Sequence, residues 1–451
     1  MREIYSIEKK EKVFFVGIGG VSMSGLAVYL KKLGYDVLGS DKVNSEQTEN
    51  LVKNGIKVFI GHKKENVSGA TIGVYSSAIS NENPELLALK KSGARLIKRS
   101  ELLGEIIKGY KVSVGVSGSH GKTTTTTMIT EILKASCKSV TAFVGGESVS
   151  FGNLLIGNGD IIVFEACEYK KNFLDLKPTI SVVLNIDDDH ADTFVDEKDR
   201  VSTFNEYAKD SLCFYNKDDE SASKLNLYTS ISFGIDKRAV FRAINVRKND
   251  LGYSFTIVRY NKKIERINLK IKGRHNVYNA LVSFAVAYSL GVEQKIIKRS
   301  LENFGGVKRR NEFLGEFNGA KIYADYAHHP SEIKAYLDCF NENFKDVVVI
   351  FQPHTYSRTR ALMGKFIECF SEKFPVYIYK TYPAREKHDI KGSGYTLYKE
   401  LKRKIGPSAY YLKNETELKG VVLSKKMENK TILVIGAGDV YEKIKKFLIK
   451  N

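Results

Sequence analysis

A glycine-rich stretch near residue 120 contains the residue types best suited to bind a phosphate chain. It reads Gly118-Ser119-His120-Gly121-Lys122-Thr123-Thr124. Glycines allow backbone N–H groups to close around an anion at the start of a helix. A following lysine reaches the β- and γ-phosphates, and the next hydroxyl group is suited to Mg2+. The stretch therefore predicts a nucleoside triphosphate site in which Lys122 contacts phosphate and Thr123 contacts the metal.

The elements around this stretch favour the same interpretation. Residues 111–116 are apolar and β-branched, as in a buried strand, and residues 123–135 carry apolar side chains at helical spacing. The spacing within the loop is unusual, because the usual pattern would place the first glycine at Val116, whereas here it is Gly118. An ordinary glycine-rich turn before a Lys-Thr pair is the alternative.

Polar residues also follow the next strands predicted in this region. We expect Thr123, Glu165 and His190 at one edge of a parallel sheet, where ligands of such sheets bind. A carboxylate beside a phosphate loop suits Mg2+. His190 would contact the metal, or water bound to it, unless it is a loop residue in an acidic cluster. Glu168 belongs either to this site or to the surface.

A second glycine-rich turn lies after the first predicted strand. It contains Gly17, Gly19 and Gly20, and Ser22 stands where a dinucleotide fingerprint has its third glycine. Asp41 follows the second predicted strand, where an acidic residue commonly binds a ribose hydroxyl. Taken alone, the turn indicates NAD or another nucleotide diphosphate. A tight turn without a ligand is the alternative.

Four predicted strands in the last third of the chain also end in polar clusters. These clusters contain Asp325, His328, Arg358 and Arg385. Such a row of strand ends is typical of a ligand-binding edge. Arg309 and Arg310, just before this region, are either part of a solvated linker or phosphate contacts.

Chain length and hydrophobic pattern predict the fold class. The 451 residues are enough for about three domains, and strands alternate with helices in the first and last thirds. This alternation predicts an α/β protein with parallel sheets. Residues 240–271 instead predict a small antiparallel meander. We expect domain boundaries near residues 107 and 308.

Charge and cysteine content indicate the partners and the compartment. The net charge is +19, but the lysines are spread along the chain in short pairs, without a nucleic-acid-binding signature. No apolar run approaches the roughly 20 residues that cross a bilayer, and the charged N-terminus does not resemble a signal peptide. Five widely spaced cysteines suit a reducing compartment. We expect a cytoplasmic protein without nucleic acid partners or membrane insertion.

The motifs, taken in order, resemble those of the Mur ligase family over nearly the whole chain. The segments that carry the resemblance are residues 14–25, 118–124, 164–169, 185–192, 273–280, 326–333 and 351–354. The shifted first glycine of the phosphate loop also matches this family. Ala327 replaces a common glycine and Ser119 a common threonine, and neither change removes a catalytic group. The resemblance assigns no carbamylated-lysine role to Lys198.

The resemblance implies three α/β domains with different ligands. A Rossmann-like domain, residues 1–107, would hold a UDP-sugar. A central P-loop ATPase-like domain with the small antiparallel sheet, residues 108–308, would bind ATP and Mg2+. A C-terminal Rossmann-like domain, residues 309–451, would close over the site and help to bind an amino acid.

Residue roles are carried over from the matching motifs. The implied UDP-sugar contacts are Gly17, Gly19, Gly20, Ser22, Ser40, Asp41 and Ser76. The implied ATP contacts are residues 118–124, His275, Asn276, Asn279, Arg309, Asp325 and His328. The implied metal ligands are Thr123, Glu165 and His190, and the implied catalytic groups are Lys122, Glu165 and His190. The implied carboxylate contacts are Arg358 and Arg385.

The implied activity is ATP-dependent ligation of L-alanine to the lactyl carboxylate of UDP-N-acetylmuramate through an acyl phosphate, in peptidoglycan precursor synthesis. One alternative is a recycling ligase that adds a tripeptide to the same UDP-sugar, although residues 167–171 favour the alanine reaction. Folylpolyglutamate synthase would lack the first domain. An NAD-dependent oxidoreductase leaves the phosphate loop unexplained, and a nucleic-acid-binding NTPase leaves the first domain unexplained.

Overall fold

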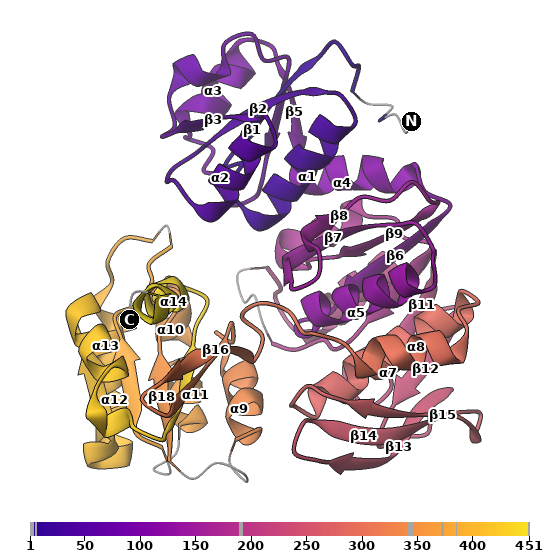
Figure 1. Cartoon of the computed structure of the whole chain (residues 1–451). Helices are drawn as coiled ribbons and strands as arrows, with labels where there is room; N and C mark the ends of the chain where they lie inside the picture. Colours follow the sequence, from indigo (N-terminus) through magenta and orange to yellow (C-terminus); the bar gives the residue numbers. More distant parts are fainter. Residues whose placement is uncertain are drawn as a thin grey trace. The chain divides into compact units, whose positions relative to one another are not determined.

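The chain folds into two compact units that contain three β-sheets. A computed structural model describes Ile4 and residues 7–188, 193–340, 346–370, 374–384 and 386–449 (Figure 1). The first unit comprises residues 1–270 and 276–305, and the second comprises residues 271–275 and 306–451. The predicted α/β class is confirmed, because all three sheets contain parallel strands joined through helices. The boundaries near residues 107 and 308 stay predictions.

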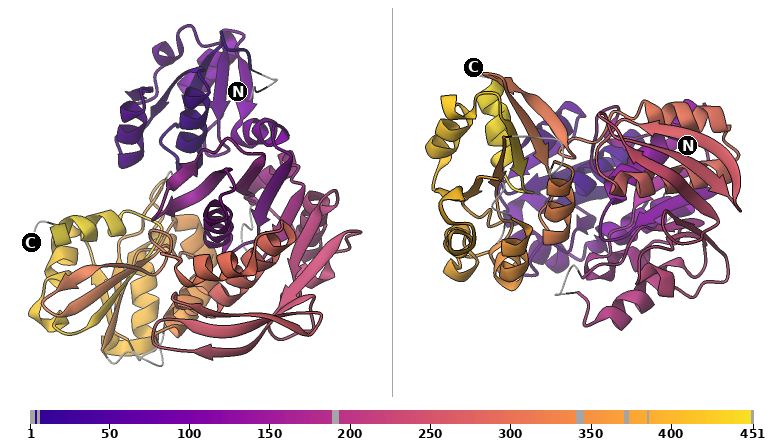
Figure 2. Two further views of the ribbon diagram at one scale, coloured as in Figure 1. Left: turned by 45° about the vertical axis from the view of Figure 1, so that its right-hand side comes forward. Right: turned by 90° about the horizontal axis from the view of Figure 1, so that it is seen from below.

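The N-terminal sheet is fully parallel and has the strand order β3-β2-β1-β4-β5. Its strands are β1 Lys12–Val16, β2 Asp36–Asp41, β3 Lys57–Ile60, β4 Ile72–Tyr75 and β5 Arg95–Lys98. Its helices are α1 Val21–Lys32, α2 Glu46–Lys53, α3 Pro84–Lys91 and α4 Arg99–Lys108. Val13 and Phe15 of β1 join one apolar cluster and Phe14 and Val16 join another, so both faces are covered (Figure 2). The order reverses between β1 and β4, where such sheets bind ligands.

The central sheet of the first unit has ten strands in the order β15-β14-β13-β12-β11-β10-β6-β9-β7-β8. Its first seven strands along the chain are β6 Val112–Ser117, β7 Val140–Ser148, β8 Gly152–Leu155, β9 Ile161–Glu165, β10 Ile180–Val183, β11 Leu212–Asn216 and β12 Ser230–Gly234. Two helices connect them, α5 Lys122–Ala135 and α6 Glu197–Ala208. The sequence prediction found β6, β9 and β10 but missed β7, β8, β11 and β12.

The predicted antiparallel meander is present and extends this sheet. It consists of β13 Phe241–Lys248, β14 Tyr253–Arg259 and β15 Lys262–Leu269. The turn between the last two strands has positive φ at Tyr260 and Asn261. Parallel pairing of Phe233 with Phe241 and of Gly234 with Arg242 joins the meander to β12, so it is not a separate sheet. Helices α7 His275–Ser289 and α8 Gln294–Glu302 follow it.

The second unit contains a six-stranded sheet in the order β16-β17-β21-β18-β19-β20, with β16 antiparallel to its neighbour. The strands are β16 Glu312–Phe317, β17 Ala320–Asp325, β18 Val347–Phe351, β19 Val376–Tyr379, β20 Ala409–Leu412 and β21 Thr431–Ile435. The helices are α9 Pro330–Asp338, α10 Tyr356–Ala361, α11 Met363–Cys369, α12 Gly394–Ile405, α13 Glu415–Val422 and α14 Val440–Ile449. Alternate residues of β18 face two apolar clusters, as expected of a sheet covered on both sides. Edge strands β16 and β20 were not predicted.

Within the described ranges, no helix combines the length and the apolar character needed to cross a membrane.

Candidate functional site

The predicted phosphate loop lies between β6 and α5. Gly118 has φ +131° and Gly121 has φ +85°, backbone conformations that side chains other than hydrogen rarely adopt. A Cβ atom on Gly121 would also lie 2.6 Å from Oδ1 of Asn279. The backbone therefore requires glycine at both positions, and the close approach of α7 also requires it at Gly121.

Lys122, the first residue of α5, turns its ammonium group back over this loop. Its Nζ lies 2.5 Å from the carbonyl oxygen of Gly118 and 3.2 Å from that of Ser119. It also lies 3.1 and 3.0 Å from the two carboxylate oxygens of Glu168, whose side chain is only 2% exposed. Burial lowers the pKa of Lys122, but the negative charge of Glu168 outweighs it, so the pKa is raised above its ordinary value. The lysine is thus a fixed cation.

Glu168 belongs to the loop site, which decides between the two interpretations that the sequence left open. It follows β9 by three residues and is buried against Lys122. The distance of a residue from a strand end along the chain does not show whether its side chain is buried. For this reason the sequence alone did not distinguish a site carboxylate from a surface one.

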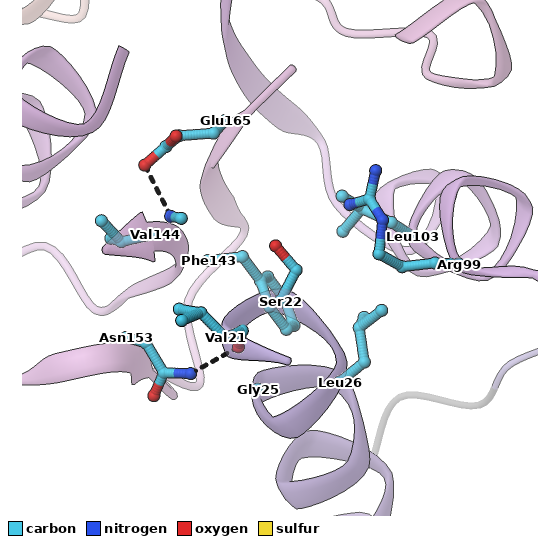
Figure 3. Close-up of a pocket in the computed structure, with 11 residues that line it drawn as sticks. Val21, Ser22, Gly25, Leu26, Arg99, Leu103, Phe143, Val144, Asn153 and Glu165 are labelled. Atoms are coloured by element: carbon cyan, nitrogen blue, oxygen red, sulfur yellow. Dashed lines mark hydrogen bonds between the residues drawn. The ribbon is translucent and has the colours of Figure 1, made fainter. Parts of the chain in front are cut away.

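Glu165 ends β9, next to the strand that leads into the loop. Its backbone pairs with Val116 of β6, and its Oε1 accepts a hydrogen bond of 2.5 Å from the N–H of Gly145 (Figure 3). Its charge contributes to the raised pKa of Lys122. Thr123 lies in the first turn of α5 and is 9% exposed. The structure therefore places both described metal-site candidates at this sheet edge, while His190 lies outside the described residues.

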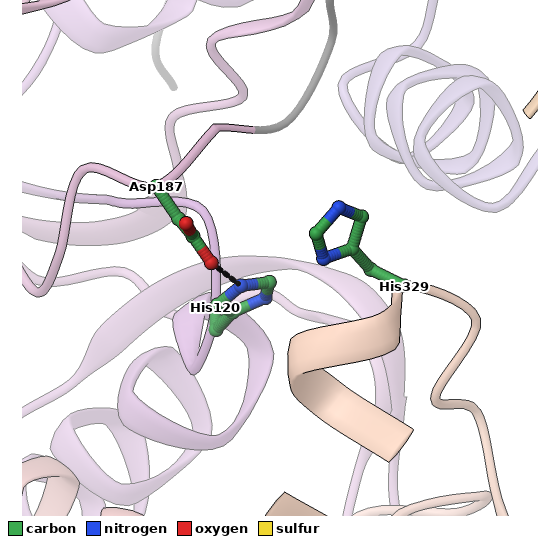
Figure 4. Close-up of side chains that lie close together, drawn as sticks. All are labelled: His120, Asp187 and His329. Atoms are coloured by element: carbon green, nitrogen blue, oxygen red, sulfur yellow. Dashed lines mark hydrogen bonds and ion pairs between the residues drawn. The ribbon is translucent and has the colours of Figure 1, made fainter. Parts of the chain in front are cut away.

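The loop is fastened to the end of β10 by hydrogen bonds. The N–H groups of Ser119 and His120 donate to the carbonyl oxygen and Oδ1 of Asn185, at 3.2 and 2.8 Å. Asn185 in turn donates to the carbonyl oxygen of His120 at 3.1 Å. His120 Nε2 lies 3.1 Å from a carboxylate oxygen of Asp187 (Figure 4). These contacts fix the loop shape and the orientation of the His120 ring.

The predicted adenine-side motif lies at the start of α7. His275 is the first residue of the helix, and Asn276 and Asn279 are 8% and 4% exposed. Asn279 donates to Oδ1 of Asn276 at 3.0 Å and approaches Gly121 closely. The two asparagines and the loop are therefore brought together. Thr124, in the first turn of α5, is 8% exposed.

The glycine-rich turn between β1 and α1 is organised by an acidic side chain. The N–H of Gly19 donates to Oδ2 of Asp41 at 2.9 Å, and Gly17 has φ +77°. Gly20 is the residue before α1, and Ser22 lies in its first turn. The turn, the acid and the helix start thus lie together.

Two further predicted sugar-nucleotide residues lie differently. Ser40 is fully buried, and its hydroxyl donates to Oε2 of Glu85 at 2.5 Å. The same carboxylate oxygen lies 2.7 Å from Nδ1 of His62. The Ser40 side chain therefore supports the fold of this sheet edge instead of facing a ligand. Ser76 follows β4 and is partly buried.

In the second unit, Arg309 is held by the fold. One of its terminal nitrogens donates to the carbonyl oxygens of Gly436 and Gly438, at 3.1 and 2.9 Å. Its guanidinium carbon lies 4.8 Å from the ring centres of both Tyr326 and Tyr441. These contacts leave the side chain little freedom to reach a ligand.

Neighbouring residues of that unit lie around a partly buried acid, Asp325. Asp325 accepts hydrogen bonds of 2.8 Å from the N–H groups of Asn311 and Ala327. Burial raises the pKa of Asp325 to about 6, although the charge of Arg310 opposes this shift. Glu332 lies 3.4 Å from His328 Nδ1 and 3.9 Å from Arg310. Arg310 was predicted together with Arg309, as a linker residue or a phosphate contact. The contacts of Glu332 with His328 and Arg310 were not predicted.

Of the two arginines predicted to bind a carboxylate, the structure describes one. Arg358, on α10, donates to the carbonyl oxygen of His354 at 3.2 Å. Arg385 lies outside the described residues.

Comparison with known proteins gives matches along almost the whole chain. Residues 12–111 match the Mur ligase family, catalytic domain; residues 116–287 match the Mur ligase middle domain; residues 309–438 match the Mur ligase, glutamate ligase domain. The UDP-N-acetylmuramate–L-alanine ligase of Caldicellulosiruptor saccharolyticus is 40% identical over 98% of this chain and 99% of its own. That of Clostridium beijerinckii is 38% identical over 96% of each chain.

Solved structures give the same picture. The crystal structure of UDP-N-acetylmuramate-alanine ligase MurC from Thermotoga maritima has a TM-score of 0.86 and 29% identity, over 97% of this chain and 98% of that one. The murein peptide ligase Mpl from Psychrobacter arcticus has a TM-score of 0.73 and 21% identity, over 97% and 98% of the two chains. The second likeness concerns the fold alone.

Proposed function

Because the chain belongs to the Mur ligase family, we propose that it joins L-alanine to the lactyl carboxylate of UDP-N-acetylmuramate and converts ATP to ADP and phosphate. Full-length relatives named for this ligation support the substrates. The observation that carries the chemistry is the partly buried, charged Lys122 over a phosphate loop held by hydrogen bonds, beside the carboxylate of Glu165.

The ATP site of this proposal is built around the start of α5. The backbone of residues 118–124 and the Lys122 ammonium group would hold the phosphates, with Asn276 and Asn279 on the adenine side. Asp325, His328 and the arginine pair would complete the site from the second unit. Of that pair, Arg310 is the better candidate, because carbonyl oxygens and tyrosine rings already hold Arg309.

The donor atoms available at the loop fit Mg2+. This ion prefers oxygen ligands, and the hydroxyl of Thr123 and the carboxylate of Glu165 are oxygen donors at one sheet edge. The Gly145 N–H holds the Glu165 carboxylate in place. When bound, Mg2+ would neutralise charge on the transferred phosphoryl group. His190 is proposed as a further contact from its motif alone.

The sugar nucleotide would bind at the carboxyl ends of β1 and β4. Gly17, Gly19, Gly20 and Asp41 are the proposed contacts, since the turn is held by the Gly19–Asp41 hydrogen bond. Ser22 and Ser76 are weaker candidates by position alone. Arg358 and Arg385 remain proposals for carboxylate binding.

Two displacement steps account for the proposed products. A lactyl carboxylate oxygen bonds to the γ-phosphorus while the bond to the ADP oxygen breaks, which gives an acyl phosphate and ADP. The alanine amine then bonds to the acyl carbon, phosphate leaves, and the amine proton passes to solvent. Both steps gather negative charge, so the charged Lys122 would stabilise them and the loop would position the γ-phosphate.

The test is ADP release with UDP-N-acetylmuramate and L-alanine, L-serine, glycine or a tripeptide. The proposal expects release that requires both the UDP-sugar and an amine and is fastest with L-alanine. Release that does not depend on the UDP-sugar would reject it. Faster release with the tripeptide would assign the recycling reaction instead.

We also propose that the reaction takes place in the cytoplasm. The five cysteines are free thiols in the structure, which suits a reducing compartment.

A further inference from the structure

A hollow lies between the N-terminal and central sheets of the first unit (Figure 3). It is small and partly open to solvent, and it is lined by the starts of α1 and α4 and by β7, β8 and β9. Asn153 of β8 fixes its walls to each other, because its amide donates to the carbonyl oxygen of Val21 at 2.7 Å and to Ser24 Oγ at 3.2 Å. Hydrogen bonds between β8 and α1 therefore hold the hollow in shape.

Arg99 supplies the cation of this hollow. Its side chain is partly buried beside Leu103, and among the described residues no acceptor forms a hydrogen bond or ion pair with its guanidinium group. A guanidinium group carries five N–H donors in a planar fork that matches a carboxylate or a phosphate. A partly buried arginine without a protein acceptor is thus suited to an anionic ligand.

The helices around the hollow favour negative charge as well. Helix α1 begins at Val21, with Ser22 in its first turn, and α4 begins at Arg99 itself. Helix starts favour anions, and the first turn of α1 contains no acidic residue. Glu165 borders the opposite side, where its Oε1 accepts the N–H of Gly145.

We propose that this hollow binds the lactyl carboxylate of the sugar nucleotide and that Arg99 recognises it; this inference rests on the proposed function. The hollow connects Ser22, at the sugar-nucleotide turn, with Glu165, beside the phosphate loop. A carboxylate held there would lie between the two sites that the reaction must join.

The consequence is selectivity between two sugar nucleotides. UDP-N-acetylglucosamine has the same nucleotide and sugar ring but no lactyl carboxylate. Arg99 would then contribute to binding of UDP-N-acetylmuramate and contribute nothing to binding of UDP-N-acetylglucosamine.

The test compares both ligands on each variant by isothermal titration calorimetry. Arg99→Met should weaken binding of UDP-N-acetylmuramate by about tenfold or more, the usual value of a charged hydrogen-bonded contact, and leave UDP-N-acetylglucosamine within about twofold. Arg99→Lys, which keeps the charge but loses the fork, should fall between. The control is Arg95→Met, four residues earlier, whose guanidinium pairs with Glu11 at 3.9 Å.

Both affinities are measured on the same protein sample. Partial unfolding of a variant affects both measurements equally and therefore does not change their ratio. An equal loss for both ligands, or no loss for either, overturns the proposal. So does an unaltered protein that binds both ligands equally. An unaltered protein that binds neither would reject the proposed function instead.

Discussion

Two glycine-rich turns of the first unit each join a strand to a helix, but the side chains beside them carry opposite charges. In the turn before α1, the N–H of Gly19 is held by the Asp41 carboxylate. In the loop before α5, Ser119 and His120 are held by a neutral asparagine, and Lys122 begins the helix. We therefore propose a hydroxyl-bearing ligand for the first turn and a phosphate chain for the second.

The charged residue beside each turn decides which ligand it suits. A helix start favours any anion, so glycines alone do not distinguish a dinucleotide site from a UDP-sugar site or from a triphosphate site. A carboxylate beside the turn can accept hydrogen bonds from ribose hydroxyls. A partly buried lysine instead stabilises the negative charge that develops during phosphoryl transfer. Substitutions at these charged residues test the comparison directly.

The largest effect is expected for Lys122→Ala. Loss of this partly buried cation should lower kcat by about 10^3-fold or more, because charge in the transition state loses its fixed counter-ion. ADP release in the presence of both co-substrates measures it. Lys134→Ala, an exposed position near the end of the same helix, is the control. Near-normal turnover of Lys122→Ala in a folded protein would sink the assignment of the loop.

The sequence predicts much of the structure around these two turns, because each strand, loop and helix there is formed by residues that are neighbours in the chain. Hydrophobic periodicity located β6 to within one residue, expecting residues 111–116 where the strand is Val112–Ser117. Parallel topology then brought Glu165 to the edge that carries Lys122, since adjacent strands end together. Strand, loop and helix are encoded by neighbours in the chain.

The remaining features depend on packing between distant segments. The position of Ser40 in the sequence predicts a ligand contact. In the structure its hydroxyl donates a hydrogen bond to Glu85, 45 residues later in the chain. The sequence does not distinguish Arg309 from Arg310. In the structure, only Arg309 donates to the carbonyl oxygens of Gly436 and Gly438, in the loop after β21. Short strands such as β8 and β20 have four residues each, too few for a clear alternation.

The next largest effect should come from adding one methyl group to each turn. In Gly121→Ala the new Cβ atom meets Asn279 at 2.6 Å, and the residue must keep φ +85°. This strain is expected to cost about 1–3 kcal/mol and to weaken ATP binding by tens of fold. Gly19→Ala has no such backbone strain, and its Cβ atom meets the movable Asp41 carboxylate at 2.9 Å.

The two alanine variants should therefore separate the ligands. Gly121→Ala should raise KM for ATP, and Gly19→Ala should raise KM for UDP-N-acetylmuramate by a smaller factor. Steady-state kinetics with each co-substrate varied in turn measures both. If either variant impaired both ligands equally, the two turns would not be independent sites.

A change of about tenfold, in the direction of tighter binding, is expected for Glu168→Gln. Lys122 has three N–H donors, and four acceptors lie within 3.2 Å of Nζ, so a phosphate must compete with the Glu168 carboxylate. Glutamine keeps the shape but removes the charge. Calorimetric titration with ADP in the absence of Mg2+ isolates this effect from metal binding.

Glu131→Gln is the matched control, since Glu131 lies on α5 and accepts its hydrogen bonds from Ser148 and Ser150. Weaker ADP binding by Glu168→Gln would mean that the carboxylate positions the lysine instead of competing with the phosphate.

The smallest effect is expected for Asp41→Asn, and it decides what the acid of the first turn does. The amide oxygen can still accept the N–H of Gly19, so the turn should keep its shape, but the charge that binds ribose hydroxyls is lost. A charged hydrogen bond exceeds a neutral one by about 1 kcal/mol, so KM for UDP-N-acetylmuramate should rise about fivefold. The kcat value and the KM for ATP should not change. If Asp41→Asn behaves like the unaltered protein while Asp41→Ala is impaired, the acid holds the turn and does not recognise the ribose.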